Sequence, residues 1–137
     1  MIIDANNLIL GRMASYIAKK ALLGNRVDVV NCENCVIIGK KREILGRYNK
    51  RLQRGVHTKG PFLPKMPDRF VKKTIRGMIP YNISKGKSAF KNVRCYIGVP
   101  ENLKNEKMEN LKGMNISKLD AIDYIRINEV CKFLGGR

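Results

Sequence analysis

The sequence predicts an α/β fold, because short runs of β-branched residues alternate with segments of helical periodicity. The order is clearest at the amino terminus, where the apolar run MIIDA at 1–5 precedes a helical pattern and then the run RVDVVN at 26–31. A strand, a helix and a strand in this order favour a right-handed crossover between parallel strands. At 137 residues the chain is most simply a single domain over residues 1–137, large enough to bury a core.

The first helix is expected within residues 8–24. Its apolar residues recur near helical spacing at Leu8, Met13, Ile17 and Ala21. An asparagine pair at 6–7 favours a turn before this helix, and the glycine–asparagine pair at 24–25 is typical of a helix C-terminus. Beyond the strand at 26–31, the run CVIIG at 35–39 predicts another strand or the end of one.

Residues 40–54 predict a helix with two distinct faces. One face carries the apolar residues Ile44, Leu45, Tyr48 and Leu52. Another face carries cations at i, i+3, i+4 and i+7 spacing, namely Arg47, Lys50, Arg51 and Arg54. This spacing places four positive charges along one side of a helix, where they match a run of phosphates.

An irregular connection is expected at residues 55–67, which contain two glycines and three prolines. A connection of this length in a compact domain is usually functional or mobile. Pro67 and Asp68 then suit the first turn of a second basic helix, which Pro80 ends. On this helix one stripe is cationic (Arg69, Lys72, Lys73, Arg76) and the other is apolar (Phe70, Val71, Ile75, Met78, Ile79).

Weaker patterns complete the chain. Ser84 is expected to cap a short helix that runs through Phe90, and RCYIGV at 94–99 predicts a strand. The remaining patterns are a polar surface excursion at 101–118, a strand candidate at 124–128 and a terminal helix with a glycine stop at 129–136. We therefore expect residues 101–137 to form a peripheral C-terminal segment.

The net charge of +17 is concentrated in one part of the chain. Residues 40–94 contain seventeen Lys or Arg against two Asp or Glu, whereas the segments on either side are nearly balanced. A block of this kind, carried by two helices and their connection, is the electrostatic footprint of a polyphosphate partner. A general solubilising surface would instead spread its cations evenly. We therefore predict nucleic-acid binding through the basic block, residues 40–94.

Four cysteines are present, and two of them form the CxxC motif of Cys32 and Cys35. Zinc sites usually pair two such motifs or add suitably spaced histidines, whereas Cys95 and Cys131 stand alone and His57 lies 22 residues past the motif. A redox CxxC normally caps a helix that lowers its thiol pKa, but an apolar run follows here. Structural thiols are the favoured interpretation, with redox and metal-binding roles as alternatives.

The sequence predicts neither catalysis nor a cofactor or metal. A GxGxxG motif is absent, and Asn34 stands where a P-loop would need its first glycine. Acidic residues near predicted strand ends, Asp4, Asp28 and Glu33, leave a metal-dependent nuclease as an alternative. No apolar run approaches the roughly 20 residues of a membrane helix, and the first ten residues lack a signal-peptide pattern, so we expect a cytoplasmic protein.

Three stretches of the chain form a set typical of one protein family. The most specific is IRGMIP at 75–80, followed after a short spacer by Gly86-Lys87 and by VRCYIGVP at 93–100. The others are IIDANNLILGRMASYIAK at 2–19 and VVNCENCVIIGKK at 29–41, and GPF at 60–62 also fits. Together they resemble the L-thirteen family of universal large-subunit ribosomal proteins in its archaeal-type form. The match is loose after residue 100.

The resemblance implies a three-layer α/β/α fold around a four-stranded, mainly parallel sheet, similar to Rossmann folds but without a nucleotide site. It implies a structural constituent of the large ribosomal subunit that is not an enzyme, binds large-subunit ribosomal RNA, and supports subunit assembly and translation. The implied partners are this RNA and neighbouring large-subunit proteins, with no membrane, cofactor or small-molecule substrate. Carried over by position, the family signature is Arg76, Gly77, Met78, Pro80 and Gly86.

We predict that the cations and the histidine of the basic block contact the RNA. The predicted RNA-binding residues are Lys40, Lys41, Arg42, Arg47, Lys50, Arg51, Arg54, His57, Lys59, Lys65, Arg69, Lys72, Lys73, Arg76, Lys85, Lys87, Lys91 and Arg94. The residues expected to anchor this block to the core are Met78, Ile79, Phe90 and Val93. Gly77 and Gly86 are expected either to permit close backbone approach or to serve as ordinary turn or C-cap residues. Recognition would use the shape and charge of folded RNA, with little base readout.

Two features depart from the family pattern. Cys32 and Cys95 stand where small or aliphatic residues are expected, which favours buried strand thiols. The histidine that the family typically has near Tyr81 is missing. A third functional class also remains beside the ribosomal protein and the nuclease: a DNA-coating protein, which a preference for duplex DNA over ribosomal RNA would indicate.

Overall fold

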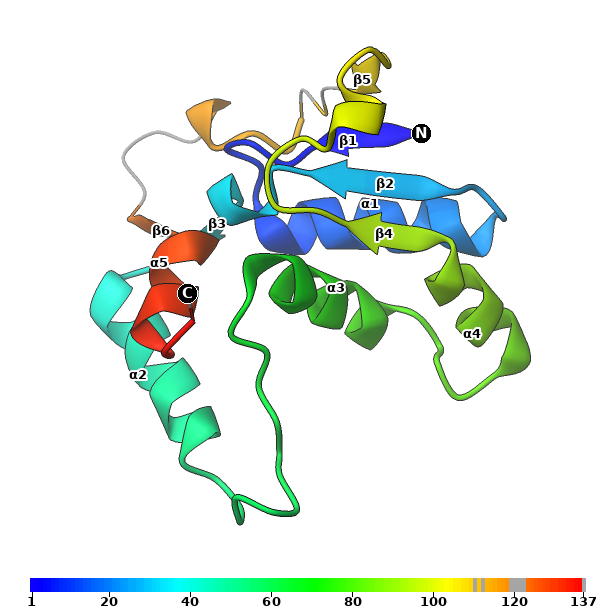
Figure 1. The fold of residues 1–137 in the computed structure, drawn as a ribbon. Helices are drawn as coiled ribbons and strands as arrows, with labels where there is room; N and C mark the ends of the chain where they lie inside the picture. The colour runs from blue at the N-terminus through cyan, green and yellow to red at the C-terminus, as the bar shows by residue number, and fades with distance from the viewer. Residues whose placement is uncertain (110, 112, 119–122, 137) are drawn as a thin grey trace.

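Strand β2 lies inside a four-stranded parallel sheet in a computed structural model that describes residues 1–109, 111, 113–118 and 123–136 (Figure 1). The strands are β1 (Ile2–Asp4), β2 (Val27–Val30), β4 (Val93–Cys95) and β5 (Met108–Glu109), in the order β4-β2-β1-β5. Each neighbouring pair in this order is parallel. The predicted α/β class and its four-stranded parallel sheet are confirmed, and the arrangement is consistent with the expected three-layer α/β/α fold.

Helix α1 (Leu10–Leu22) connects β1 to β2, as the sequence predicts. In the turn before it, Asn7 takes a left-handed backbone conformation with a φ of 57°, which asparagine tolerates. After the helix, Gly24 has a φ of 92°, and its N–H donates to the carbonyl of Ala21. The predicted turn and the glycine C-terminus therefore fix where this helix begins and ends.

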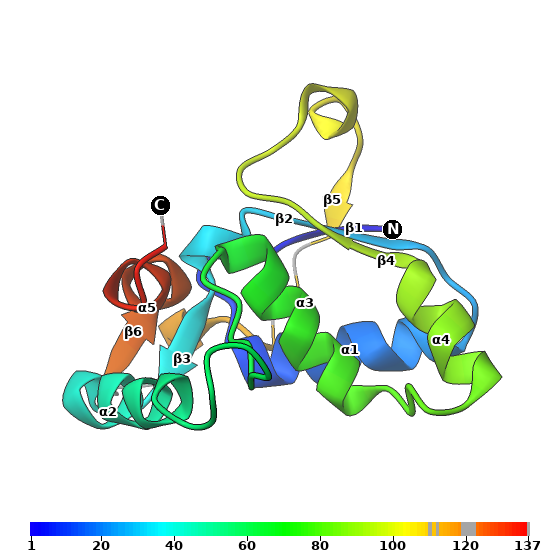
Figure 2. The same ribbon diagram turned by 60° about the horizontal axis from the view of Figure 1, so that its bottom comes forward.

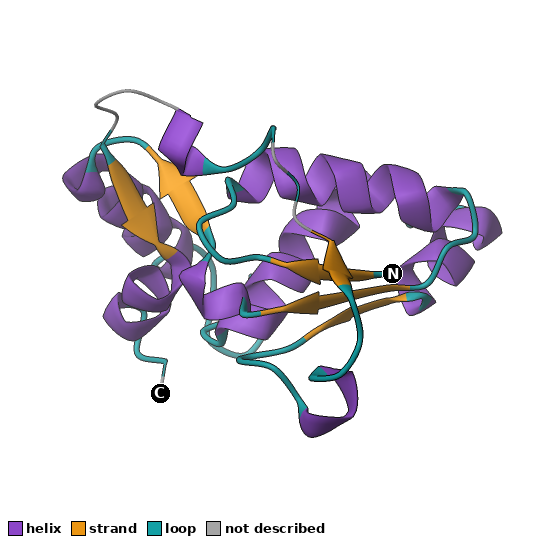
Figure 3. Ribbon diagram, turned by 90° about the horizontal axis from the view of Figure 1, so that it is seen from above, coloured by secondary structure: helices purple, strands orange, loops and turns teal. Residues whose placement is uncertain are grey.

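Three helices cover one side of the sheet. They are α1, α3 (Pro67–Met78) and α4 (Ser84–Lys91), while a segment with the short 3-10 helix η2 (Glu101–Leu103) lies on the other side (Figures 2 and 3). Val71 and Ile75 of α3 are fully buried in the same core as Val27 and Val29 of β2. Each such aliphatic side chain contributes about 1.5–3 kcal/mol on full burial. The apolar stripe predicted for the second basic helix therefore attaches that helix to the core.

The strand predicted at 35–39 belongs to a second sheet of two strands. There β3 (Val36–Ile38) pairs in antiparallel register with β6 (Tyr124–Arg126), the strand candidate near the carboxyl terminus. The fourth strand of the main sheet is instead β5, which was not predicted. Its two residues pair with Ile2 and Ile3, and so short a strand shows no alternation in the sequence.

Part of the carboxy-terminal segment enters the core. Helix α5 (Ile127–Phe133) follows β6, and Ile125, Ile127 and Val130 are buried in the main apolar cluster. The short helices η1 (Cys32–Asn34) and η3 (Ile116–Lys118) complete the described elements. The exposed residues at 104–107 fit the expected surface excursion. From β6 through α5, one side of the segment is buried in the core and the other, including Tyr124 and Phe133, is exposed.

Helix α2 (Lys41–Leu52) and the connection at 53–66 extend from the body before the chain returns as α3 (Figures 1 and 2). Ile44 is buried, and the rings of Tyr48 and Phe70 meet edge to face with centroids 5.2 Å apart. Leu52 was expected on the same apolar face but is 38% exposed. The helix is therefore attached along its first turns, and its far end is open to solvent.

Met78 does not anchor the basic block, contrary to the prediction. It is the last residue of α3 and is 42% exposed. The backbone becomes extended at Ile79, with a φ of −104° and a ψ of 140°, and this change of direction brings Ile79 into the core instead. Val93 is fully buried and Phe90 partly buried against the core, so three of the four expected anchors are confirmed.

The start of α4 depends on Gly86 and not on a serine cap. The N-cap residue is Ile83, no side chain caps the helix, and Ser84 is already its first helical residue, so the predicted Ser84 cap is wrong. A Cβ added at Gly86 would collide with the backbone carbonyl of Pro80, whereas a Cβ at Gly77 would meet nothing within 4 Å. Close backbone approach is therefore confirmed for Gly86 and wrong for Gly77.

The thiols of the CxxC motif are packed inside the protein. Cys32, Cys35 and Cys131 are free and buried, and the Cys35 thiol donates a hydrogen bond to the carbonyl of Leu8 at 3.1 Å. Burial raises the pKa of Cys35 to about 12 and the pKa of Cys131 to about 11. A hydrogen bond with the Cys95 thiol, together with burial, raises the pKa of Cys32. Buried, protonated thiols support the structural interpretation over the redox one.

Replacing Gly86 with alanine is expected to lower the free energy of unfolding by about 1–3 kcal/mol, because the new methyl group has no room beside Pro80. Gly77→Ala is the matched control, since its methyl group would enter open space on a helix that favours alanine over glycine. Urea denaturation of the two variants and the parent measures the difference. Equal stability of the two variants would contradict the close approach at Gly86.

Alkylation of the native protein with iodoacetamide at pH 8 is expected to modify Cys95 before the other three cysteines. Cys95 is the partly exposed thiol, whereas the raised pKa values and burial of Cys35 and Cys131 keep those thiols protonated and covered. Mass spectrometry of peptides at successive times gives the order. In denaturant all four should react at similar rates, and rapid native modification of Cys35 would refute the structural interpretation.

Candidate nucleic-acid interface

The predicted RNA-binding side chains lie at the surface. Each of them is exposed apart from Lys72, which is half-buried. Most come from α2, the connection at 53–66, α3 and α4. These elements lie on the side of the molecule away from β1 and β5, with α2 and α4 at opposite ends of that side and α3 between them (Figures 1 and 2). We call this exposed cationic face of α2, residues 53–66, α3 and α4 the basic surface.

Two of the predicted residues are separated from the basic surface. Arg94 lies in β4 between Val93 and Cys95, whose side chains pack against the core, so its own side chain points to the opposite face of the sheet. Lys41 forms an ion pair with Glu129 of α5, with Nζ and Oε2 2.7 Å apart. This pair connects the first turn of α2 to the carboxy-terminal helix.

The cations of α2 are exposed as the helical spacing predicts. Arg47, Lys50 and Arg51 are exposed on the helix. Arg54 is exposed as well, but it lies beyond the end of α2 at Leu52, so the predicted helix over 40–54 stops short of it. The guanidinium of Arg51 lies 5.6 Å from the centroid of the Tyr48 ring, a distance that permits a cation–π interaction. Burial raises the pKa of Tyr48, so its hydroxyl stays protonated and able to donate. The buried side of α2 thereby supports one of its exposed cations.

Aromatic rings also support the cations of α3. The Arg76 guanidinium lies 4.1 Å from the centroid of the Tyr81 ring, and the Lys72 ammonium lies 5.2 Å from that of Phe90. Tyr81 and Phe90 meet edge to face with centroids 5.4 Å apart. Two cations of the α3 stripe are therefore held over an aromatic pair that joins the α3–α4 turn to α4. A cation held in this way loses less conformational freedom when it binds a phosphate.

Acidic residues do little to neutralise the basic surface. The basic block contains only Glu43 and Asp68. Asp68 lies in the first turn of α3, where a negative charge is favourable, and its buried Oδ1 has no hydrogen-bond partner in the described part of the chain. Neither carboxylate is paired in an ion pair with the cations of α2 or α3 among the described residues. The surface therefore presents a strong positive field to an anionic partner.

The connection at 53–66 contributes cationic side chains, and part of it is held against α3. His57, Lys59 and Lys65 are exposed in it. The ammonium of Lys73 on α3 donates a hydrogen bond to the backbone carbonyl of Phe62 at 2.9 Å. This bond holds the part of the connection that carries Phe62, a residue that is 70% exposed, against α3.

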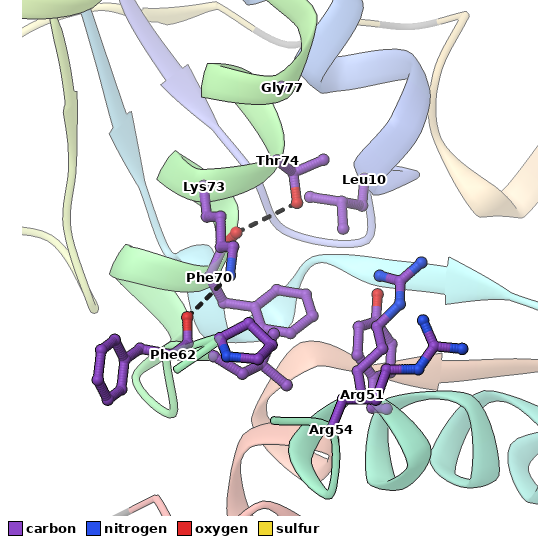
Figure 4. Close-up of a pocket in the computed structure, with 11 residues that line it drawn as sticks. Leu10, Arg51, Arg54, Phe62, Phe70, Lys73, Thr74 and Gly77 are labelled. Carbon is purple, nitrogen blue, oxygen red and sulfur yellow. Dashed lines mark hydrogen bonds between the residues drawn. The ribbon is translucent and has the colours of Figure 1, made fainter. Parts of the chain in front are cut away.

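A pocket of about 510 Å³ lies between α2, α3 and the connection (Figure 4). Its lining residues are Leu10, Tyr48, Arg51, Arg54, Pro61, Phe62, Leu63, Phe70, Lys73, Thr74 and Gly77. In Figure 4 Arg51 of α2 and Arg54, just beyond the end of α2, lie across the pocket from Lys73 and Thr74 on α3. The sequence did not predict this pocket or the aromatic residues Phe62 and Tyr81. The sequence feature that could have indicated them was the interleaving of aromatic and basic residues in the basic block.

The acidic residues considered for a nuclease are used in local structure. Asp4 accepts hydrogen bonds from the Asn6 N–H and the Asn31 side chain, and Glu33 accepts the N–H of Gly98. Asp28 accepts the hydroxyl of Tyr96 at 3.4 Å and lies 3.7 Å from Arg26. Within the described residues no group of three or more His, Cys, Asp or Glu could hold a metal ion.

Among the described residues, no helix combines the length and apolar character needed to span a bilayer.

His57, the one histidine of the chain, makes no hydrogen bond to another side chain in that part of the structure. It lies in the connection at 53–66, away from the acidic residues named above. The arrangement therefore offers binding groups for phosphate but no paired acid and base.

Comparisons with known proteins agree with the motifs of the sequence. A sequence model of the family described as Ribosomal protein L13 matches residues 1–102. The large ribosomal subunit protein uL13 of Archaeoglobus fulgidus is 41% identical over 137 residues, covering 99% of this chain and 88% of the relative. The uL13 proteins of Methanopyrus kandleri and Methanosarcina barkeri are each 39% identical, covering 98% and 99% of this chain and 86% and 98% of the relatives.

Proposed function

The chain belongs to the ribosomal protein L13 family, and we propose that it binds large-subunit ribosomal RNA through the basic surface as a structural component of the large ribosomal subunit. Membership of a ribosomal protein family agrees with the expectation of a structural protein rather than an enzyme. The proposed location is the ribosome in the cytoplasm. The proposed further partners are neighbouring proteins of the large subunit, and the proposed role includes support of subunit assembly.

The observation that carries the proposal is the exposure of unneutralised cations on three successive helices. Arg47 and Lys50 on α2, Arg69 on α3, and Lys87 on α4 are exposed and make no ion pair with the described acidic residues. Lys and Arg side chains that neutralise phosphates release condensed counterions, and this release drives most of the binding free energy. A surface of this composition therefore supports an extended phosphate-backbone partner rather than a small ligand.

The geometry of the helices favours folded RNA. A helix of 12 residues, such as α2 or α3, is about 18 Å long. A duplex presents one charge per roughly 1.7 Å of its axis, so a cationic stripe of this length spans several phosphates. Two such helices joined by a cationic connection can follow a curved RNA surface, recognised mainly by shape and backbone.

Affinity for large-subunit ribosomal RNA is expected to fall steeply with salt. If six to ten phosphates are contacted, the binding constant should drop about 10³–10⁵-fold between 50 and 200 mM salt on a duplex-DNA scale. A filter-binding titration with random RNA and duplex DNA of equal length provides the comparison. Ribosomal RNA should retain its advantage at high salt. Equal binding of the three polymers would favour a general nucleic-acid-coating protein and would refute recognition of a particular RNA surface.

Reversing four exposed cations of the basic surface to Glu (Arg47, Lys50, Arg69 and Lys87) is expected to lower ribosomal RNA affinity at least about 100-fold at 100 mM salt. Among the described residues, none of these four side chains takes part in a hydrogen bond, an ion pair or a cation–π interaction with another side chain. The fold should therefore persist. Filter binding and circular dichroism measure the two effects separately.

The matched control reverses Lys118 and the exposed Lys104, Lys107 and Lys132, all of which lie outside the basic block. This variant has the same net charge as the first. It should keep most of the RNA affinity, because its substitutions lie away from the basic surface. Equal losses in the two variants would show that overall charge, and not the basic surface, determines binding. Lys112, another cation of the carboxy-terminal segment, lies outside the described residues and is left unchanged.

A further inference from the structure

We propose that the pocket between α2 and α3 binds the base of one unpaired nucleotide of the RNA. The inference rests on the proposed RNA-binding function and adds one base contact to a surface that otherwise contacts phosphates. A pocket of about 510 Å³ falls in the range of roughly 300–1,000 Å³ in which proteins hold small ligands. A single base with its sugar is a ligand of this class.

The floor of the pocket is apolar and aromatic. Leu10 of α1 and Phe70 of α3 are buried there (Figure 4), and Leu63 of the connection also lines the pocket. The Tyr48 ring packs edge to face against Phe70. Nucleobases bind such surfaces because every base has an apolar face that stacks on aromatic side chains. A phosphate alone would gain nothing from this floor.

The rim of the pocket is cationic. Arg51 lies on α2, Arg54 lies two residues beyond its end, and Lys73 lies on α3 across from them (Figure 4). Lys73 uses one of its three N–H bonds on the Phe62 carbonyl, and two remain for an incoming anion. Among the described residues, none that lines the pocket is acidic. A ligand that joins an apolar ring to a phosphate therefore matches the pocket better than an apolar side chain of a neighbouring protein.

Two further groups suit a base. The Tyr48 hydroxyl makes no hydrogen bond within the described residues, so it is available to the polar edge of a base. Phe62 at the rim is 70% exposed as a residue, although an aromatic side chain of this size usually gains by burial. Stacking against an inserted base would cover this ring. The Lys73 hydrogen bond already holds the backbone of Phe62 at the pocket.

Gly77 keeps the pocket open. It lines the pocket one helical turn after Lys73 and Thr74, so these three residues share one side of α3. A Cβ at Gly77 would meet nothing within 4 Å, which means that no packing requirement calls for glycine there. Its hydrogen side chain instead leaves the space that a ligand needs. A larger residue at this position would enter the pocket without changing any charge.

The first experiment titrates the protein with adenosine 5′-monophosphate and, separately, with ribose 5-phosphate, and follows backbone amides by NMR. The mononucleotide should shift the amides of Phe62, Phe70, Thr74 and Gly77 and bind at least about tenfold more tightly than ribose 5-phosphate, because only the mononucleotide has a base to stack. Equal affinity of the two compounds would overturn the proposal, since the cations alone would then explain binding.

The second experiment repeats the titration with Gly77→Leu and with Phe62→Ala. Both variants should lose mononucleotide affinity by about tenfold, because the first fills the pocket and the second removes the stacking ring. Gly11→Leu is the matched control, a helical glycine outside the pocket whose Cβ also meets nothing within 4 Å. It should bind like the parent. Unchanged mononucleotide affinity in both pocket variants would overturn the proposal, because two different changes to the pocket would then have had no effect.

Salt dependence separates this inference from the RNA-binding function on which it rests. Gly77→Leu should weaken binding to large-subunit ribosomal RNA several-fold without changing the slope of log affinity against log salt, because no phosphate contact is removed. Charge reversal on the basic surface should reduce that slope. If charge reversal abolishes binding while Gly77→Leu has full affinity, only the base pocket is refuted. If charge reversal has no effect, the proposed function fails instead.

Discussion

Pairing of β2 with a parallel strand on each side is the constraint on which the rest of the structure depends. Its four residues are buried throughout, and β1 and β4 form its two neighbours. A parallel neighbour cannot follow a strand directly, because the chain must first return to the other end of the sheet. The crossover between β2 and β4 is therefore obligatory, and nearly all of the basic block lies within it. Topology thus separates the apolar core from the cations.

The crossover remains attached through a few apolar positions, which leaves its other side available for charge. Val71, Ile75 and Ile79 hold α3 to the core, and Ile44 and Tyr48 hold α2. Like charges on the outer side repel one another, and this repulsion opposes compactness in the free protein. Aromatic rings beneath three of the cations and the apolar stripe of α3 offset part of it. An RNA partner would remove the rest by neutralising the surface.

The sequence predicts those parts of the structure that depend on local patterns. Helices α1, α2 and α3 follow from apolar spacing, and the exposed stripes on α2 and α3 follow from the same spacing. Which strands pair with one another, by contrast, is not determined by the local sequence. The run at 35–39 has the same composition whichever sheet it joins, so its pairing with β6 could not be predicted. Gly77 and Gly86 show a similar limit, because what distinguishes them is how the turn at 79–83 folds the Pro80 carbonyl back against Gly86, which residue type alone does not specify. The pocket likewise requires the relative placement of α2 and α3, which no periodicity specifies.

The ion pair between Lys41 and Glu129 has a consequence for the order of events during synthesis. Its two residues are 88 positions apart, and β3 likewise cannot pair with β6 until β6 has been synthesised. At roughly 5–20 residues per second, translation needs about 4–18 s to cover that distance. Late in this interval the basic helices have been synthesised, while the ion pair and the β3–β6 pairing that complete the base of α2 have not yet formed. A nascent chain in this state presents a loosely held polycation to nearby nucleic acid. The last contacts at the base of α2 therefore form only when the carboxy-terminal helix arrives, after all of the cations of the basic block are in the chain.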